Sequence, residues 1–172
     1  MFWAKVGGIC LTCIIIDATF SLKKISTSFM NVQTIKCNNI DSMMKKMIEI
    51  DEEYEYSVAW IDSLNKNIRG ILTCANHATE NEVKNKKINE KLIYKTKNLF
   101  NMHSFFNINL INNLSIKLFN ELWFRKAHKK NKSEIQTISK FFHPLDGLQN
   151  WNKLYGKKGF YQYQFVVPDE SK

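Results

Sequence analysis

The chain has 172 residues, enough for one domain of ordinary size with a hydrophobic core. Hydrophobic residues make up 44% of it and aromatic residues 13%, which excludes an intrinsically disordered chain. The net charge of +9 comes almost wholly from lysine. The basic clusters at 84–97 and 125–132 lie in polar stretches between periodic segments, which favours solvated loops over a nucleic-acid surface.

The N-terminal apolar run is too short to cross a membrane. It extends from Ile9 to Ile16 between Lys5 and Asp17, whereas a spanning helix needs about 20 residues. It also lacks the small-x-small cleavage site of a signal peptide. We therefore expect no transmembrane segment and a cytoplasmic location.

The cysteines and histidines do not predict a metal site. Cys10 and Cys13 form a CxxC, which can be a redox pair or half of a zinc site, but no second CxxC or CxxH supplies the other half. We expect Cys37 and Cys74 to be small buried hydrophobes. No histidine has a carboxylate or cysteine partner at metal or triad spacing; the four are His77, His103, His128 and His143.

The first half of the chain predicts strands and one helix. A Gly-Gly turn lies within residues 1–13, and 14–22 (IIIDATFSL) is typical of a buried strand. Residues 29–37 alternate as a second strand. Asn39 or Asp41 then caps a helix whose apolar stripe is Ile40, Met43, Met44, Met47 and Ile48.

Two further strands follow, at 54–62 (YEYSVAWID) and at 68–77 (IRGILTCANH). In the first, alternation predicts Tyr54, Tyr56, Val58 and Trp60 on one face, with Glu55, Ser57, Ala59 and Ile61 on the other. A helix is predicted at 114–126 and a strand at 134–142.

The last segment, 141–168, predicts a turn, a short helix and a long strand. The helix has Leu148, Trp151, Leu154 and Tyr155 on one face and ends at Gly156. In the strand, Tyr161, Tyr163, Phe165 and Val167 alternate with Phe160, Gln162, Gln164 and Val166. Neutral amides at Gln162 and Gln164 suit hydroxyl-rich ligands, but they also suit a strand with one face in water.

This order of elements predicts an α+β fold, with a mostly antiparallel sheet and helices on one face. There is no phosphate-cradling glycine loop and no GxSxG motif. The residues by themselves therefore predict a fold class and a candidate surface, without a reaction.

Three segments together resemble a known family. FWAKVGGICLTCIII resembles a stretch of the FAD-linked oxidoreductases of the vanillyl-alcohol oxidase superfamily. YSVAWID and FFHPLDGLQNWNKLYGKKGFYQYQFVVP resemble the substrate domain of the decaprenylphosphoryl-β-D-ribose oxidases, the flavin subunits of two-component sugar epimerases. ELWFRKA lies where that family has a similar helix end, so the resemblance covers nearly the whole chain.

The resemblance implies a mechanism in which FAD takes a hydride from the 2-hydroxyl carbon of a lipid-linked pentose, and a partner reductase reduces the resulting keto sugar. It places Gly7, Gly8, Thr12 and Ile14 against FAD. It places Ser57 and Trp60 on the substrate side, and Gln162 and Gln164 in the sugar pocket beside Phe142, Leu145 and Phe160. No residue is assigned a catalytic role.

The sequence also departs from the family pattern. Cys10 and Cys13 stand where the family has glycines, and their side chains oppose close approach of the flavin. Phe142 replaces what is usually a tyrosine. We expect 1–24 to be the C-terminal remnant of a FAD-binding domain and 25–172 a substrate domain incomplete at its C-terminus, without the family's active-site lysine.

The expected chain is thus an internal fragment of an FAD-dependent sugar oxidase that is inactive alone. Two alternatives stay open. One is a non-catalytic partner module that complements a separately encoded FAD domain; the other is a basic nucleic-acid binder, which the composition disfavours.

Overall fold

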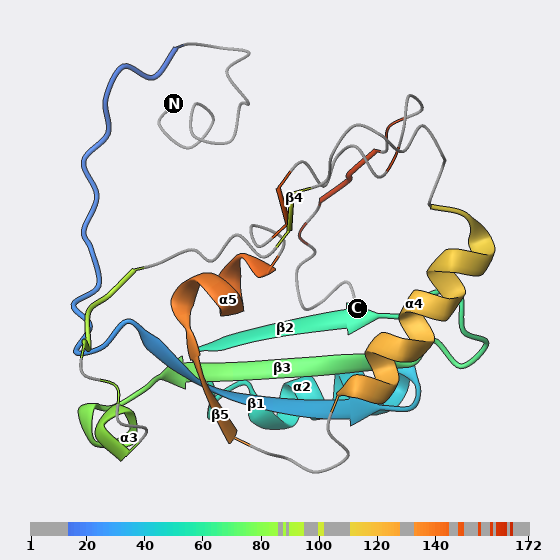
Figure 1. Ribbon diagram of the computed structural model, residues 1–172, viewed down its shortest axis with the longest axis horizontal. Helices are drawn as coiled ribbons and strands as arrows, with labels where there is room; N and C mark the ends of the chain where they lie inside the picture. The colour runs from blue at the N-terminus through green and yellow to red at the C-terminus, as the bar shows by residue number, and fades with distance from the viewer. Residues whose placement is uncertain are drawn as a thin grey trace.

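A four-stranded antiparallel sheet, ordered β2-β3-β1-β5, forms the centre of the chain (Figure 1). The computed structural model describes residues 14–85, 88, 90–94, 100–101, 111–127, 133–144, 148–149, 155, 159, 161–164 and 166. The sheet strands are β1 (Phe29–Cys37), β2 (Tyr56–Ile61), β3 (Gly70–His77) and β5 (Ser133–Thr137). A separate parallel pair joins β4 (Phe100–Asn101) to β6 (Leu148–Gln149).

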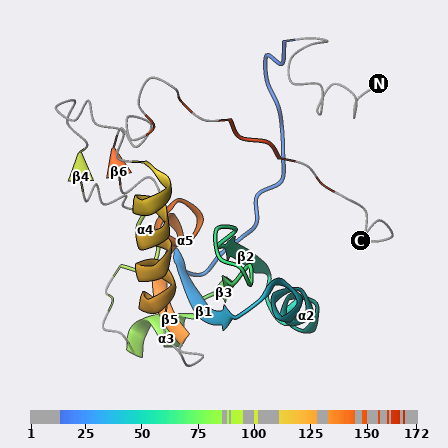
Figure 2. The same cartoon turned by 90° about the vertical axis from the view of Figure 1, so that its right-hand side faces the viewer.

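Helices cover parts of both faces of this sheet (Figure 2). The helix α2 (Ile40–Ile50) and the short α3 (Glu80–Asn85) lie on one face, and α4 (Asn113–Lys126) and α5 (Ile138–Phe142) lie on the other. The predicted α+β class with an antiparallel sheet is confirmed, but the helices lie on both faces of the sheet instead of the one face predicted. Among the described residues, no helix is long and apolar enough to cross a membrane.

The face covered by α2, called the α2 face below, holds the largest apolar cluster. Asn39 caps the helix by accepting a hydrogen bond from the Ser42 backbone N–H at 2.8 Å, so of the two predicted caps Asn39 is correct. The helix then buries Met43, which is 1% exposed, against the sheet. The cluster comprises Cys37, Met43, Ile50, Leu72 and Cys74.

The opposite face, called the α4/α5 face, has its own cluster of Met30, Val32, Ala75 and Phe141. Phe141 comes from α5, which begins where the Thr137 side chain accepts a hydrogen bond from the Lys140 backbone N–H at 3.3 Å. The predicted strand at 134–142 is therefore wrong beyond Thr137. The cap starts a helical turn that places Ile138 and Phe141 on one side.

Two other sequence predictions also differ from the structure. Residues 14–22 form no strand; this stretch has no regular structure, and its apolar side chains, including Ile16, are exposed. Tyr54 does not share a face with Tyr56: it packs with the α2-face cluster, whereas Tyr56 packs with the opposite one. The strand begins only at Tyr56, so alternation does not extend back to Tyr54.

The C-terminal prediction is also not matched in the described residues. Leu148 belongs to the two-residue strand β6 instead of a helix, and Trp151, Leu154 and Gly156 lie outside the described part of the chain. Tyr161–Gln164 and Val166 are exposed and belong to no strand. Phe160, Phe165 and Val167 lie outside the described residues.

Candidate functional site

Strand β2 carries two of the predicted substrate residues, and it places them on opposite faces. Ser57 pairs with Cys74, whose side chain is in the α2-face cluster, and Trp60 pairs with Ile71. Because side chains three apart on a strand point to opposite sides, Ser57 lies on the α2 face and Trp60 on the α4/α5 face. The structure therefore does not bring these two side chains into one pocket.

Trp60 shares its face with a second predicted residue, Phe142. The Phe142 ring meets the Tyr56 ring edge-on, with centroids 5.0 Å apart, and Tyr56 lies four residues before Trp60 on the same side of β2. Phe142 is 39% exposed, and Val58, between Tyr56 and Trp60, is 53% exposed. Tyr56, Val58, Trp60 and Phe142 thus form an accessible apolar and aromatic surface between α5 and α4, called the floor below.

A polar group is buried at the α5 end of this floor. The His77 ring lies edge-on to Tyr56 at 5.7 Å between centroids, and its Nδ1 is buried with no hydrogen-bond partner in the described part of the chain. Unsatisfied buried nitrogens are rare in folded proteins, so His77 is an unusual polar group beside this surface.

At the other end, an ion-pair network holds α4 on the sheet. Arg69 contacts Asp62 at 3.1 Å and Glu121 of α4 at 2.6 Å, and its guanidinium lies 4.3 Å from the centroid of the Phe124 ring. Asn120 also donates to Asp62, at 2.8 Å. The hydrogen bond from Arg69 lowers the pKa of Glu121. These contacts fix the position of α4 beside this apolar surface.

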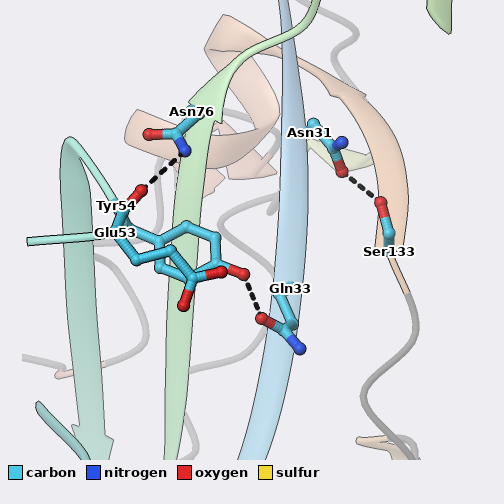
Figure 3. A pocket seen from close by; sticks show the side chains of 6 residues that line it. All are labelled: Asn31, Gln33, Glu53, Tyr54, Asn76 and Ser133. Carbon is cyan, nitrogen blue, oxygen red and sulfur yellow. Dashed lines mark hydrogen bonds between the residues drawn. The ribbon is translucent and has the colours of Figure 1, made fainter. Parts of the chain in front are cut away.

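The α2 face carries a separate polar hollow, shown in Figure 3. It has a volume of about 230 Å³ and is lined by Asn31, Gln33, Glu53, Tyr54, Asn76 and Ser133. Strands β1, β3 and β5 each contribute to it, because their register places Asn31 beside Asn76 and Gln33 beside Ser133. Sequence reasoning missed this hollow.

Hydrogen bonds orient the side chains of the hollow. The Tyr54 hydroxyl donates to Gln33 Oε1, and the Ser133 hydroxyl donates to Asn31 Oδ1 (Figure 3). Asn76 Nδ2 donates to the Glu53 carbonyl at 3.0 Å. Burial, followed by the neighbouring Glu53 carboxylate, raises the pKa of Tyr54.

A further set of bonds fixes the rim of the hollow. Asn31 Nδ2 donates to Glu82 Oε1 at 2.6 Å, and Asn76 Oδ1 accepts from the Glu55 backbone N–H at 2.7 Å. Hydrogen bonds from Thr79, and then from Asn31, lower the pKa of Glu82. The hollow is thus built from fixed amides, hydroxyls and carboxylates.

Of the remaining predicted site residues, the structure describes Ile14, Gln162 and Gln164, and none of them lies in the sheet. Ile14 is 87% exposed in the irregular segment before β1, and Gln162 and Gln164 are exposed outside any strand. The others lie outside the described residues: Gly7, Gly8, Thr12, Leu145 and Phe160.

The cysteines that the structure describes behave as buried hydrophobes, as predicted. Cys37 and Cys74 are both buried free thiols, and burial raises the pKa of Cys74 to about 11. Within the described ranges, no group of histidine, cysteine, aspartate and glutamate residues could hold a metal ion. Cys10 and Cys13 lie outside those ranges.

Comparison with known proteins gives an extensive match. No protein-family model matches the chain. The chain is similar to the decaprenylphosphoryl-β-D-ribose oxidase of Mycolicibacterium smegmatis, with 31% identity over 175 residues that cover 99% of this chain and 38% of the relative. It is also similar to an uncharacterized protein in the mprA 5′ region of Streptomyces coelicolor, with 28% identity over 81 residues, 45% of this chain and 22% of that protein.

The predicted resemblance to this type of oxidase is therefore confirmed over nearly the whole chain. The chain spans less than two-fifths of the length of the curated relatives it matches.

Proposed function

We propose that residues 25–172 are the substrate domain of an FAD-dependent oxidoreductase that acts on a lipid-linked pentose, and that residues 1–24 belong to the end of its FAD-binding domain. The observation that carries the proposal is the 31% identity to a decaprenylphosphoryl-β-D-ribose oxidase over 99% of this chain. FAD, when bound, would supply the hydride acceptor, and a partner reductase would take the keto sugar onward.

The α4/α5 face is the surface we assign to the pentose. The resemblance implies that Trp60 lines the substrate side and that Phe142 flanks the sugar pocket, and both side chains lie on this accessible face, with Tyr56 between them. Aromatic rings present a flat apolar surface against which the C–H side of a sugar packs, while they exclude water from the reacting carbon. Ser57 lies on the other face of the sheet and therefore does not line this surface, although the resemblance implies that it contacts the substrate.

We expect the isolated chain to be unable to oxidise the sugar. Cys10 and Cys13 stand where related FAD-binding stretches have glycines, and a Cβ at a glycine position opposes close approach of a cofactor. Of the residues expected against FAD, Ile14 is described, and its exposed side chain is available to a partner surface. The test is to purify the chain and measure its flavin absorbance. Stoichiometric FAD would contradict this part of the proposal.

A second candidate is a non-catalytic module that complements a separate FAD domain. It is favoured by α4, whose apolar side chains Leu114, Leu118 and Leu122 are all exposed. Exposed apolar stripes of this length mark surfaces that another protein covers. To test this candidate, we use as the partner the part of the M. smegmatis oxidase to which this chain does not align.

Co-expression with that probe distinguishes the two candidates. Restored oxidation of decaprenylphosphoryl-ribose supports the oxidoreductase, and we expect Trp60→Ala to abolish it while Tyr94→Ala, at an exposed tyrosine elsewhere, leaves it intact. Complex formation without oxidation supports the module. If the two chains do not associate and neither binds the lipid-linked sugar, both candidates are wrong.

A further inference from the structure

We propose that the polar hollow on the α2 face is a second binding site, which takes a neutral vicinal diol such as a single sugar ring. It goes beyond the proposed function, because the hollow lies on the face of the sheet opposite Trp60.

The hollow interrupts an otherwise apolar face. On β1, the apolar side chains of this face are Phe29, Ile35 and Cys37, which pack in apolar clusters, and Asn31 and Gln33 lie between Phe29 and Ile35. Asparagine is depleted in strands, but Asn31 and Asn76, opposite it on β3, are held here by side-chain hydrogen bonds to Glu82 and to the backbone of Glu53 and Glu55. The polar row is therefore a built feature of this face.

Several groups of the hollow have hydrogen-bonding capacity to spare. Gln33 Oε1 accepts from Tyr54, which leaves its Nε2 as a donor, and Nε2 has no partner within the described residues. Asn31 Nδ2 uses one N–H for Glu82 and retains a second. The Glu53 carboxylate and the Ser133 oxygen, whose hydroxyl hydrogen is directed to Asn31 Oδ1, are acceptors beside them.

This mixture of donors and acceptors selects the ligand. The Glu53 carboxylate repels an anion, and a cation leaves the amide N–H groups of Gln33 and Asn31 without an acceptor. A hydroxyl both donates and accepts, so two adjacent hydroxyls can bridge Glu53 and Gln33. The volume of about 230 Å³ is below the ~300–1,000 Å³ of sites for drug-sized ligands, which fits one sugar ring.

The experiment is an NMR titration of the ¹⁵N-labelled full chain, in which the side-chain amide signals of Gln33, Asn31 and Asn76 are followed. Three probes are added separately: D-ribose, inorganic phosphate and ethylammonium chloride. We expect D-ribose alone to shift the amide signals in a saturable manner. We expect Gln33→Glu, which keeps the shape and removes the donor, to weaken binding about tenfold or more.

Matched variants keep the test independent of folding. Asn67→Asp makes the same amide-to-acid change in an exposed turn and should leave D-ribose binding unchanged. Glu53→Gln, at an exposed position, removes the carboxylate and should also weaken binding. Wild-type affinity in Gln33→Glu, or a saturable response to phosphate or ethylammonium, would overturn the proposal. Shifts at the Trp60 indole without shifts at Gln33 would also overturn it, while supporting the pentose surface proposed above.

Discussion

Replacing Gly70 with alanine is expected to lower the free energy of unfolding by about 3 kcal/mol, the upper end of the usual cost of overpacking. Gly70 opens β3 in the middle of the sheet, between Ile61 of β2 and Cys37 of β1. A Cβ built there would lie 2.4 Å from the Trp60 carbonyl oxygen and 2.9 Å from Met43 Cε.

The carbonyl contact decides the size of the effect. The end of the Met43 side chain can rotate away, but the Trp60 carbonyl is part of β2 and moves only with the strand. Moving the oxygen from 2.4 Å to about 3.0 Å requires a displacement of roughly 0.6 Å, which a close-packed sheet transmits to the neighbouring side chains. The same displacement would shift Trp60, and with it the proposed pentose surface.

Urea unfolding followed by circular dichroism measures the loss. With a slope of ~1–3 kcal/mol per molar, the midpoint should fall by roughly 1–3 M. Gly159→Ala is the control: it has open space around it, so its positive φ of 62° should cost only about 1 kcal/mol or less. A Gly70→Ala midpoint close to that of the wild type would refute the reasoning. If the loss vanished in a Met43→Ala background, Met43 instead of the Trp60 carbonyl would be the obstacle.

Four other predictions follow from the described contacts. Arg69→Met leaves the Asp62 side chain, 4% exposed, without its cation and should lower the free energy of unfolding by about 2–3 kcal/mol in urea titrations; an unchanged midpoint would exclude a structural role for the pair. The folded-state pKa of Glu121 lies below its ordinary value of 4.5, so its contribution to folding stability is present above that pH and is lost as the pH falls through the lowered pKa. The melting temperature should therefore decline on acidification, and it should decline less steeply in Arg69→Met. The pKa of about 11 at Cys74, against an ordinary 9.0, predicts about a hundredfold slower alkylation at pH 8 than for an unperturbed thiol, measured by mass spectrometry of its peptide, and equal rates in native and urea-unfolded chain would contradict this. Asn112→Ala removes the capping box of α4 and should cost about 1 kcal/mol, with a loss of helical signal as the check.

The elements that sequence reasoning predicted correctly have both a periodic pattern and a local boundary signal. The helix α2 has an apolar stripe that includes Met43, and it has a cap at Asn39. Strands β1, β2 and β3 are apolar-rich runs of six to nine residues, although their burial does not alternate strictly. In such segments the local preference and the tertiary packing agree.

The failures have equally local causes. At Thr137 the choice between strand and helix depends on one side-chain hydrogen bond to the Lys140 N–H, which alternation does not reveal. At 14–22 the apolar run predicts a buried strand, but its side chains are exposed because an apolar run by itself specifies no partner surface. The polar hollow was missed because it depends on the register that brings Asn31 beside Asn76 and Gln33 beside Ser133, and no single segment encodes that register.

The position of β2 gives the two proposals a common structural basis. It is the edge strand next to β3, and it presents Trp60 to the α4/α5 face and Ser57 to the α2 face. On the α2 face, Ser57, Cys74 and Gln33 lie in one row across β2, β3 and β1. A ligand on one face of the sheet can contact only one of these two side chains. The resemblance that placed Ser57 and Trp60 in a single pocket therefore joins residues that the sheet separates. Trp60 lies on the same face as Phe142, where we propose the pentose surface, whereas Ser57 lies on the face of the hollow and is separated from Gln33 by the buried Cys74.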